Sequence, residues 1–423
     1  MTVGAYAGLI RRNRNFRLIW TSQLISEIGD WFYTVAVMSY VIHETGSATS
    51  MALVFVMQVL PQVLCSPVAG VINDRLSRRR IMIATDWSRC VVVALMLLVV
   101  GWGALPLLYL LLFLETVMWA LFEPARTAAI PNITEGEDTA IANALSSATW
   151  AVAFALGSGL GGLVQAYLGR NSVFLINAIS FAISALLITA TRFEEPHLHG
   201  LPRLRFRELF SFAPIADGFR YARQDAERFR TMLVKAGFGL LGVNWIALPL
   251  LGEREFPVTL PGVAPSEAGT LGMSFLLSSR GVGAIIGALA GSAYSGILPQ
   301  RLKRTIAAGF LLGGAGYLAL SQAPNFYVAA ACVMLAHAGG SAGWSSSTTL
   351  LQGITDDKFR GRVFSSEYAM SMLTLAVVAF ATGAAVDAGY PVRAVCAIVG
   401  ACSLVPLLWW SIASRAFSSG TSR

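Results

Sequence analysis

The stretch that decides the fold is Gly70-Val-Ile-Asn-Asp-Arg-Leu-Ser-Arg-Arg-Arg80, a short charged loop between two long apolar runs. The run before it, Met51–Asn73, and the run after it, Ile81–Gly101, are each long enough to cross about 30 Å of hydrocarbon at roughly 1.5 Å per residue. The loop therefore predicts a pair of membrane-spanning helices joined by a basic turn.

Runs of the same kind recur from one end of the chain to the other. Of its 423 residues, 55% are hydrophobic and only 13% are charged, whereas a soluble domain usually carries about 25% charged residues. We expect a membrane protein of twelve spans, without a soluble domain of any size between them. The expected spans are Phe16–His43, Met51–Asn73, Ile81–Gly101, Leu105–Ile130, Ala140–Leu168, Ser172–Thr191, Thr231–Leu251, Ala268–Leu298, Thr305–Gln322, Phe326–Gln352, Val363–Ala388 and Val392–Ala413.

Basic residues gather in the loops of one membrane side. The loops on the side of the termini hold Arg11–Arg17, Arg75–Arg80, Arg192–Arg230, Arg301–Arg304 and Lys358–Arg362. The opposite loops hold only Arg170, Arg254 and Arg393. Because basic loops stay in the cytoplasm, this asymmetry predicts that both termini are cytoplasmic. The net charge of +8 then reflects topology, and we expect no nucleic-acid partner.

The deciding loop has a weaker copy later in the chain. Gly70–Arg78 aligns with Gly296–Arg304, where Gln300 stands in the place of Asp74. A second pair, Ile133–Glu135 and Ile354–Asp356, precedes the expected fifth and eleventh spans. Together they predict two similar six-helix halves, as in many secondary transporters.

The two halves are expected at 1–191 and 231–423, joined by a cytoplasmic linker at 192–230. The linker contains Phe219, Tyr221 and Phe229 interleaved with Arg220, Arg223, Arg228 and Arg230. This pattern predicts a basic amphipathic helix that lies on the membrane surface and contacts anionic lipid.

Within the deciding loop, each residue type has a physical role. We expect Gly70 to let another helix approach closely, and Asp74 to cap the N-terminus of a neighbouring helix, whose dipole favours an anion. Arg75, Arg78, Arg79 and Arg80 are suited to bind carboxylates or lipid phosphate.

Inserting a charged side chain at the centre of a membrane span costs about 2.5–3.5 kcal/mol of free energy, so such residues are candidates for function. Glu27 and Asp30 are three residues apart on one face of the first span. Two close carboxylates in a low dielectric disfavour double ionisation, so one of them is expected to carry a proton, as a proton-coupled carrier requires. The alternative is that a fixed arginine pairs with them for packing alone.

Other intramembrane charges extend this set. Glu115 lies near mid-depth of the fourth span, and Arg280, near mid-depth of the eighth, is expected to be the counter-ion of Glu27, Asp30 or Glu115. Asp86 and Arg89, three apart, are expected to form a local pair that supports the cytoplasmic gate. Glu367 is expected to pair with Arg75 or Arg78 when that gate closes.

Small residues predict close helix crossings rather than chemistry. Gly157, Gly161 and Gly162 share the fifth span, and Gly283, Gly287 and Gly291 follow at four-residue steps in the eighth. We find no nucleophile–base arrangement, metal-ligand cluster or phosphate loop, so we expect no enzyme activity, no metal, no cofactor and no direct use of ATP.

The deciding loop resembles the signature of the major facilitator superfamily: a glycine, an aspartate four residues on, an arginine and a final basic pair. Gly70, Asp74, Arg75, Arg78 and Arg79 fit, while Ser77 stands where many members have glycine. Gly157-Ser-Gly-Leu-Gly161-Gly162 is similar to the antiporter motif of that superfamily, with Ser158 in the place of proline.

Two further patterns are similar to the branch that holds macrolide efflux proteins, the enterobactin exporter and the lysophospholipid flippase. They are Asn15-Phe-Arg-Leu-Ile-Trp20 with Gln23 and Gly29-Asp30, and Asp86-Trp-Ser-Arg89. The resemblance implies an all-α fold of twelve transmembrane helices in two pseudo-symmetric six-helix bundles.

It also implies a drug/proton antiporter, a monomer in the bacterial inner membrane that exports amphiphilic small molecules. Protons, the substrate and membrane lipid are the expected partners. Two alternatives stay open, a lysophospholipid flippase and a non-transporting membrane sensor.

Overall fold

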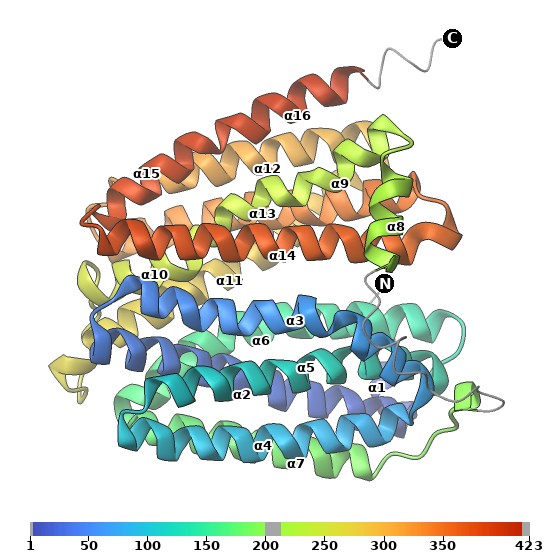
Figure 1. Cartoon of the computed structure of the whole chain (residues 1–423), viewed down its shortest axis with the longest axis horizontal. Coiled ribbons are helices and arrows are strands. Elements are labelled where there is room, and N and C mark those ends of the chain that lie inside the picture. The colour runs from blue at the N-terminus through green and yellow to red at the C-terminus, as the bar shows by residue number, and fades with distance from the viewer. Residues whose placement is uncertain (1–2, 199–212, 417–423) are drawn as a thin grey trace. The chain divides into compact units, whose positions relative to one another are not determined.

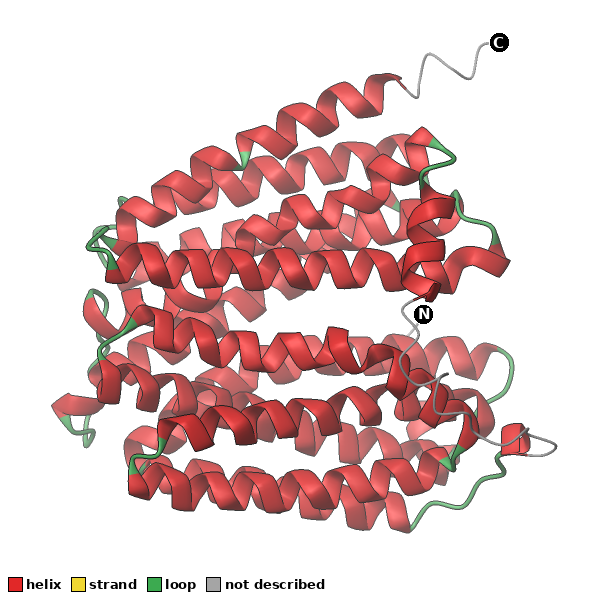
Figure 2. Ribbon diagram, in the orientation of Figure 1, coloured by secondary structure: helices red, strands yellow, loops and turns green. Residues whose placement is uncertain are grey.

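A computed structural model describes residues 3–198 and 213–416 of the chain, and in those ranges the secondary structure is helical, without a strand (Figure 2). The main helices are α1 (Val3–Arg12), α2 (Arg14–Thr45), α3 (Ala48–Arg75), α4 (Arg78–Trp102), α5 (Leu105–Ile133), α6 (Glu137–Leu168), α7 (Arg170–Thr189), α8 (Ala213–Ala222), α9 (Ala226–Phe238), α10 (Asn244–Arg254), α11 (Ala268–Ser295), α12 (Pro299–Leu320), α13 (Phe326–Gly353), α14 (Asp357–Asp387), α15 (Val392–Cys402) and α16 (Leu404–Ala416).

The predicted spans all fall on these helices. The seventh is built from α9, the short 3-10 helix Gly239–Val243 and α10, and the twelfth from α15 and α16, which follow one another in Figure 1. In the described residues, ten helical segments are long and apolar enough to cross a membrane. The first and ninth expected spans, α2 and α12, are outside that set because they are more polar. Helix α2 contains carboxylates, and α12 begins with basic residues and contains several glycines.

The chain divides into two compact units. The first contains Met1–Glu44, Met57–Ser211 and Gly262–Glu267, and the second contains Thr45–Val56, Phe212–Pro261 and Ala268–Arg423. In the first unit α4 lies beside both α5 and α7, and in the second unit α13 packs against both α11 and α12.

The first unit is held by apolar packing and by close helix crossings. Ile19 of α2, Met82 of α4 and Phe122 of α5 meet in one buried cluster. A methyl group added to Gly157 or Gly161 of α6 would lie only 2.7 Å from atoms of α2. Side chains larger than hydrogen would therefore push α6 away from α2.

The second unit uses glycine in the same way. A methyl group added to Gly283 or Gly287 of α11 would lie 2.4 Å or 2.0 Å from carbonyl oxygens of α13. Backbone-to-backbone approach of this kind brings helices together without large side chains, and it is typical of helix packing in membranes.

The described part of the linker differs from the predicted surface helix. Residues 199–212 lie outside the described residues; beyond them, the aromatic segment forms α8 and the start of α9, with a break between the two. Tyr221 stacks on Phe359 of α14 with ring centroids 4.0 Å apart, and Phe219 and Phe229 pack against the same buried cluster. The aromatic side chains therefore pack inside the protein, and α8 lies beside the end of α14 (Figure 1). The predicted contact of the basic residues with anionic lipid stays a prediction.

Large apolar side chains remain exposed on several long helices. Leu98 of α4 is 51% exposed, Leu289 of α11 is 68% exposed and Leu408 of α16 is 62% exposed. Exposed apolar surface on this scale is unfavourable in water and suits helices that face hydrocarbon.

Candidate functional site

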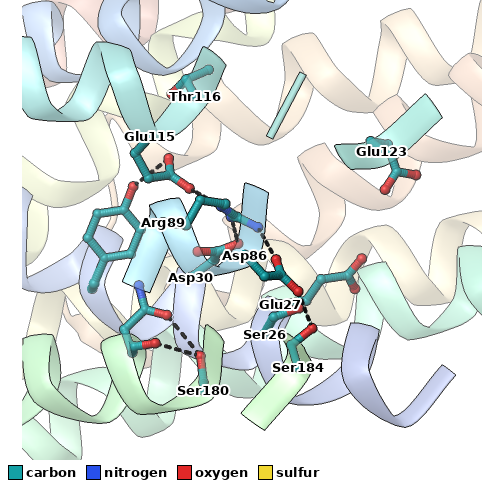
Figure 3. Close-up of polar contacts among 12 residues, drawn as sticks. Ser26, Glu27, Asp30, Asp86, Arg89, Glu115, Thr116, Glu123, Ser180 and Ser184 are labelled. Carbon is teal, nitrogen blue, oxygen red and sulfur yellow. Dashed lines mark hydrogen bonds and ion pairs between the residues drawn. The ribbon is translucent and has the colours of Figure 1, made fainter. Parts of the chain in front are cut away.

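The first unit encloses a cluster of ionisable side chains around Arg89 of α4 (Figure 3). Arg89 Nε donates to Glu115 Oε1 of α5 at 2.7 Å, and Arg89 Nη2 donates to Asp30 Oδ2 of α2 at 2.6 Å. The guanidinium thus connects α4 to α2 and α5 through charge-assisted hydrogen bonds. Its planar fork of N–H donors fixes the geometry of these bonds.

A third carboxylate approaches Arg89 from its own helix. Asp86 Oδ1 lies 3.7 Å from Arg89 Nη1, and Asp86 Oδ2 accepts a hydrogen bond from the Ser184 hydroxyl of α7. The ring of Phe181, also on α7, lies under the guanidinium at 3.9 Å from ring centroid to Cζ. These contacts fix the position of Arg89 and leave little room for water around it.

The cluster is buried and carries more negative than positive groups. Arg89 and Asp86 have side chains that are 2% and 0% exposed, and Glu115 is 6% exposed. Asp30 is the most accessible at 20%, and its buried Oδ1 makes no hydrogen bond to any described residue. Tyr33 donates to Glu115 Oε2 at 3.1 Å, so the second oxygen of Glu115 is satisfied.

A second network lies beside the first on α2 and α5. Gln23 Nε2 donates to Glu27 Oε1 at 2.8 Å, and Gln23 Oε1 accepts from Arg126 Nη1 at 2.8 Å. Arg126 also pairs with Glu123, three residues before it on α5. Glu27 therefore connects to the guanidinium of Arg126 through an amide, and its Oε2 is buried without a hydrogen bond to the described residues.

The structure assigns the counter-ion of Asp30 and Glu115 differently from the sequence. We expected Arg280, whereas Arg89 makes both ion pairs. Arg280 of α11 lies over the ring of Trp245, 4.3 Å from Cζ to the ring centroid. The prediction placed Arg89 near the cytoplasmic end of its span, where it could not reach Asp30. Arg89 follows Arg78, the first residue of α4, by eleven residues, and so lies about 16 Å along the helix. Asp86 and Arg89 thus belong to the same cluster as Asp30.

Glu367 also has a different partner from the expected arginines. Glu367 Oε2 of α14 accepts from Lys235 Nζ of α9 at 2.9 Å, and both side chains are buried. Lys235 Nζ lies 4.8 Å from the ring centroid of Trp344 on α13. Lys235 is thus the partner of Glu367 in this structure, and the pair with Arg75 or Arg78 that is expected when the gate closes stays a prediction.

Within the deciding loop, Ser77 is the residue that caps the N-terminus of α4. Ser77 accepts from Arg80 N, and Glu195 Oε1 accepts from Arg78 N at 2.6 Å. Glu195 also accepts from the Ser77 hydroxyl. The serine that departs from the superfamily signature is therefore an N-cap, which satisfies otherwise unpaired amides of the first helical turn.

The other residues of this loop face outward or bind backbone. Asp74 is exposed, Arg78 Nη1 donates to Ala128 O at 2.8 Å, and Arg79 donates to Thr189 O. A methyl group at Gly70 would meet no atom within 4 Å, so the close approach expected there is not observed. The roles of Asp74 and Arg75 in gating stay predictions.

Sequence reasoning missed Gln23, Tyr33 and Lys235 as members of these networks. Lys235 had a usable signal, since a lysine four residues into the seventh span is costly unless it is paired. Gln23 stands in the pattern that resembles the efflux branch, four residues before Glu27, whereas the signal for Tyr33 is its spacing of three residues from Asp30. No group of three or more His, Cys, Asp or Glu within the described ranges is arranged to hold a metal ion.

Long apolar helices, close glycine crossings and buried charges inside spans are the features expected of a polytopic membrane transporter. The whole described chain agrees with this: residues 3–417 match the family model described as transmembrane secretion effector, and the chain belongs to that family. The superfamily resemblance is thereby confirmed, and the chain is a secondary transporter rather than an enzyme.

Solved structures of transporters share the fold. The nucleoside transporter NupG superposes with a TM-score of 0.72 over 94% of this chain and 98% of its own, at 11% identity. A bacterial homologue of the human lysosomal transporter Spinster superposes with a TM-score of 0.73 over 99% of each chain, at 15% identity. The predicted all-α major-facilitator-type fold is confirmed by these likenesses, which at such identities concern the fold alone.

Several curated relatives are named for efflux. Macrolide efflux protein A of Streptococcus pyogenes is 23% identical over 42% of this chain and 44% of its own length. The multidrug efflux pump Tap of Mycobacterium bovis is 26% identical over 69% of this chain and 68% of its own. The uncharacterized transporter YkuC of Bacillus subtilis is 26% identical over 184 residues. That match spans less than half the length of either protein, 43% of each.

Proposed function

We propose that this protein exports amphiphilic small molecules in exchange for protons, by alternating access. The observation that carries the proposal is the buried cluster in which three carboxylates, Asp30, Asp86 and Glu115, share the single guanidinium of Arg89. In a low-dielectric environment, negative charges that exceed their counter-ions favour the uptake of a proton.

Asp30 is the residue that we propose takes up the proton. It is the most exposed carboxylate of the cluster, it pairs with Arg89 through Oδ2 alone, and its Oδ1 has no hydrogen bond to a described residue. Protonation of Asp30 would weaken its bond to Arg89 Nη2 and leave Arg89 paired with Glu115. The tie between α2 and α4 would then loosen, which connects proton binding to helix movement.

Export and an amphiphilic substrate are proposed from the relatives. A macrolide efflux protein and a multidrug efflux pump are among the proteins that this chain resembles. The basic loops described above support cytoplasmic termini, and a bacterial inner membrane fits the organisms of these relatives. We propose a monomer, since each expected half of the transporter is present in one chain.

The test is a flux assay in proteoliposomes with an imposed pH gradient, across macrolides, other amphiphilic drugs and lysophospholipids. We expect drug movement that needs the gradient in the wild type. Asp30→Asn should abolish gradient-driven flux and keep gradient-independent exchange of drug. Glu135→Gln, an exposed carboxylate of the loop before α6, is the matched control and should behave as the wild type.

Three outcomes would overturn the proposal. Normal proton-driven flux in Asp30→Asn would remove Asp30 from coupling. Movement of lysophospholipid but not of drugs, equally fast without a pH gradient, would indicate a flippase instead, and no flux of any compound in well-folded protein would favour a sensor.

A further inference from the structure

The second unit has a hollow whose lining includes none of the residues of the charged networks described above. It has a volume of about 290 Å³ and lies between α11, α12 and α13. Its walls include Gly291 of α11, Ala308 and Leu312 of α12, and Gly339 of α13. Because most of these residues are small, they leave space between the helices, and this part of the wall is apolar.

One end of the hollow is basic. Arg304 lines it, together with Tyr294 and Thr305, near the turn that joins α11 to α12. Arg304 and Leu312 both line the hollow and are eight residues apart on α12, which is about 12 Å along the helix axis. A charged end followed by an apolar channel of this length matches an amphiphile with an anionic head.

The turn beside the hollow has the surface of a membrane interface. Ile297 is 83% exposed and Leu298 is 51% exposed, and the exposed Arg301 and Arg304 follow within two turns. Leu289 on α11 and Leu311 on α12 are also exposed, at 68% and 52%. Apolar side chains that face hydrocarbon, next to arginines that reach the headgroups, are typical of a helix end at a membrane interface.

We propose that this hollow is a binding site for an anionic phospholipid of the surrounding membrane. The phosphate binds Arg304, and one acyl chain lies along Ala308 toward Leu312 and Gly339. The charge of Arg304 selects an anionic head over a zwitterionic one, and the apolar walls select a lipid over a soluble phosphate. The site is independent of the proposed transport cycle, since none of its residues belongs to the Asp30 cluster.

The test is native mass spectrometry of the full chain purified in detergent, with added phosphatidylglycerol or phosphatidylcholine. We expect a retained phosphatidylglycerol adduct in the wild type. Arg304→Gln should bind it about fivefold more weakly, as the loss of one basic contact at a membrane surface implies. Arg415→Gln, an exposed arginine at the end of α16, is the matched control and should bind as the wild type.

A second variant tests the hollow itself. Ala308→Phe should fill the channel and remove binding of phosphatidylglycerol while the melting temperature stays close to that of the wild type. Leu318→Phe, at an exposed position of the same helix that does not line the hollow, should leave binding unchanged. Excess inorganic phosphate should not displace the lipid.

Three results would overturn the proposal. Equal retention of both lipids would remove the role of the charge, and displacement by inorganic phosphate would indicate a simple anion contact. Unchanged binding in Ala308→Phe would place the lipid elsewhere. None of these results depends on whether the protein transports drugs or couples to protons.

Discussion

Arg89→Gln should destabilise the first unit far more than any exposed arginine substitution. The substitution removes the one cation that Asp30, Asp86 and Glu115 share, at a site where Arg89 is 2% exposed. Breaking a buried ion pair by removing one partner costs about 3–5 kcal/mol, because the remaining charge is left without compensation. Arg89→Gln should therefore lower the free energy of unfolding by about that amount.

The matched control is Arg220→Gln. Arg220 pairs with Asp217 three residues before it on α8, but its side chain is 74% exposed. Exposed pairs of this kind contribute about 0–1 kcal/mol. Reversible unfolding in mixed detergent micelles, followed by tryptophan fluorescence, measures both variants under the same conditions.

A double substitution separates charge from packing. Adding Asp30→Asn to Arg89→Gln removes one of the uncompensated carboxylates, so the double variant should be more stable than Arg89→Gln alone. If the cost of Arg89→Gln equals that of Arg220→Gln, or if Asp30→Asn makes the single variant worse, the reasoning about a shared counter-ion is refuted.

Two further predictions concern other parts of the chain. Lys235→Met should destabilise the second unit by about 3–5 kcal/mol, because it leaves Glu367 buried and unpaired; Lys235→Met combined with Glu367→Gln should recover most of that loss in the same unfolding assay, and no recovery would contradict a direct pair. Gly161→Leu should abolish flux and lower the melting temperature, because the new side chain would meet the backbone of α2. Gly353→Ala, where a methyl group meets no atom within 4 Å, should keep flux, and equal loss in both variants would argue against the crossing.

Local sequence patterns predicted most of the fold. The apolar runs predicted the long helices of the structure, because a helix in hydrocarbon must satisfy its own backbone and needs a fixed minimum length. Glycines at Gly157 and Gly161 predicted a crossing, and the structure shows α6 close to α2 at both positions. The linker was harder, since an amphipathic pattern does not tell whether the apolar face meets lipid or protein.

The candidate site was predictable in composition but not in pairing. Charges such as Asp30 and Glu115 are recognisable because they are costly inside a span. Their partner depends on how α2, α4 and α5 rotate against one another, and a single sequence carries no such information. The same holds for Glu367, whose partner Lys235 is 132 residues away along the chain.

The most direct test of the central claim is to measure proton and drug movement together. Proteoliposomes that contain a pH-sensitive dye inside are given a drug gradient without an imposed pH gradient. The account predicts that drug flux drives an opposite proton flux in the wild type and that Asp30→Asn moves drug without moving protons. Drug-driven proton flux of equal size in Asp30→Asn would contradict it.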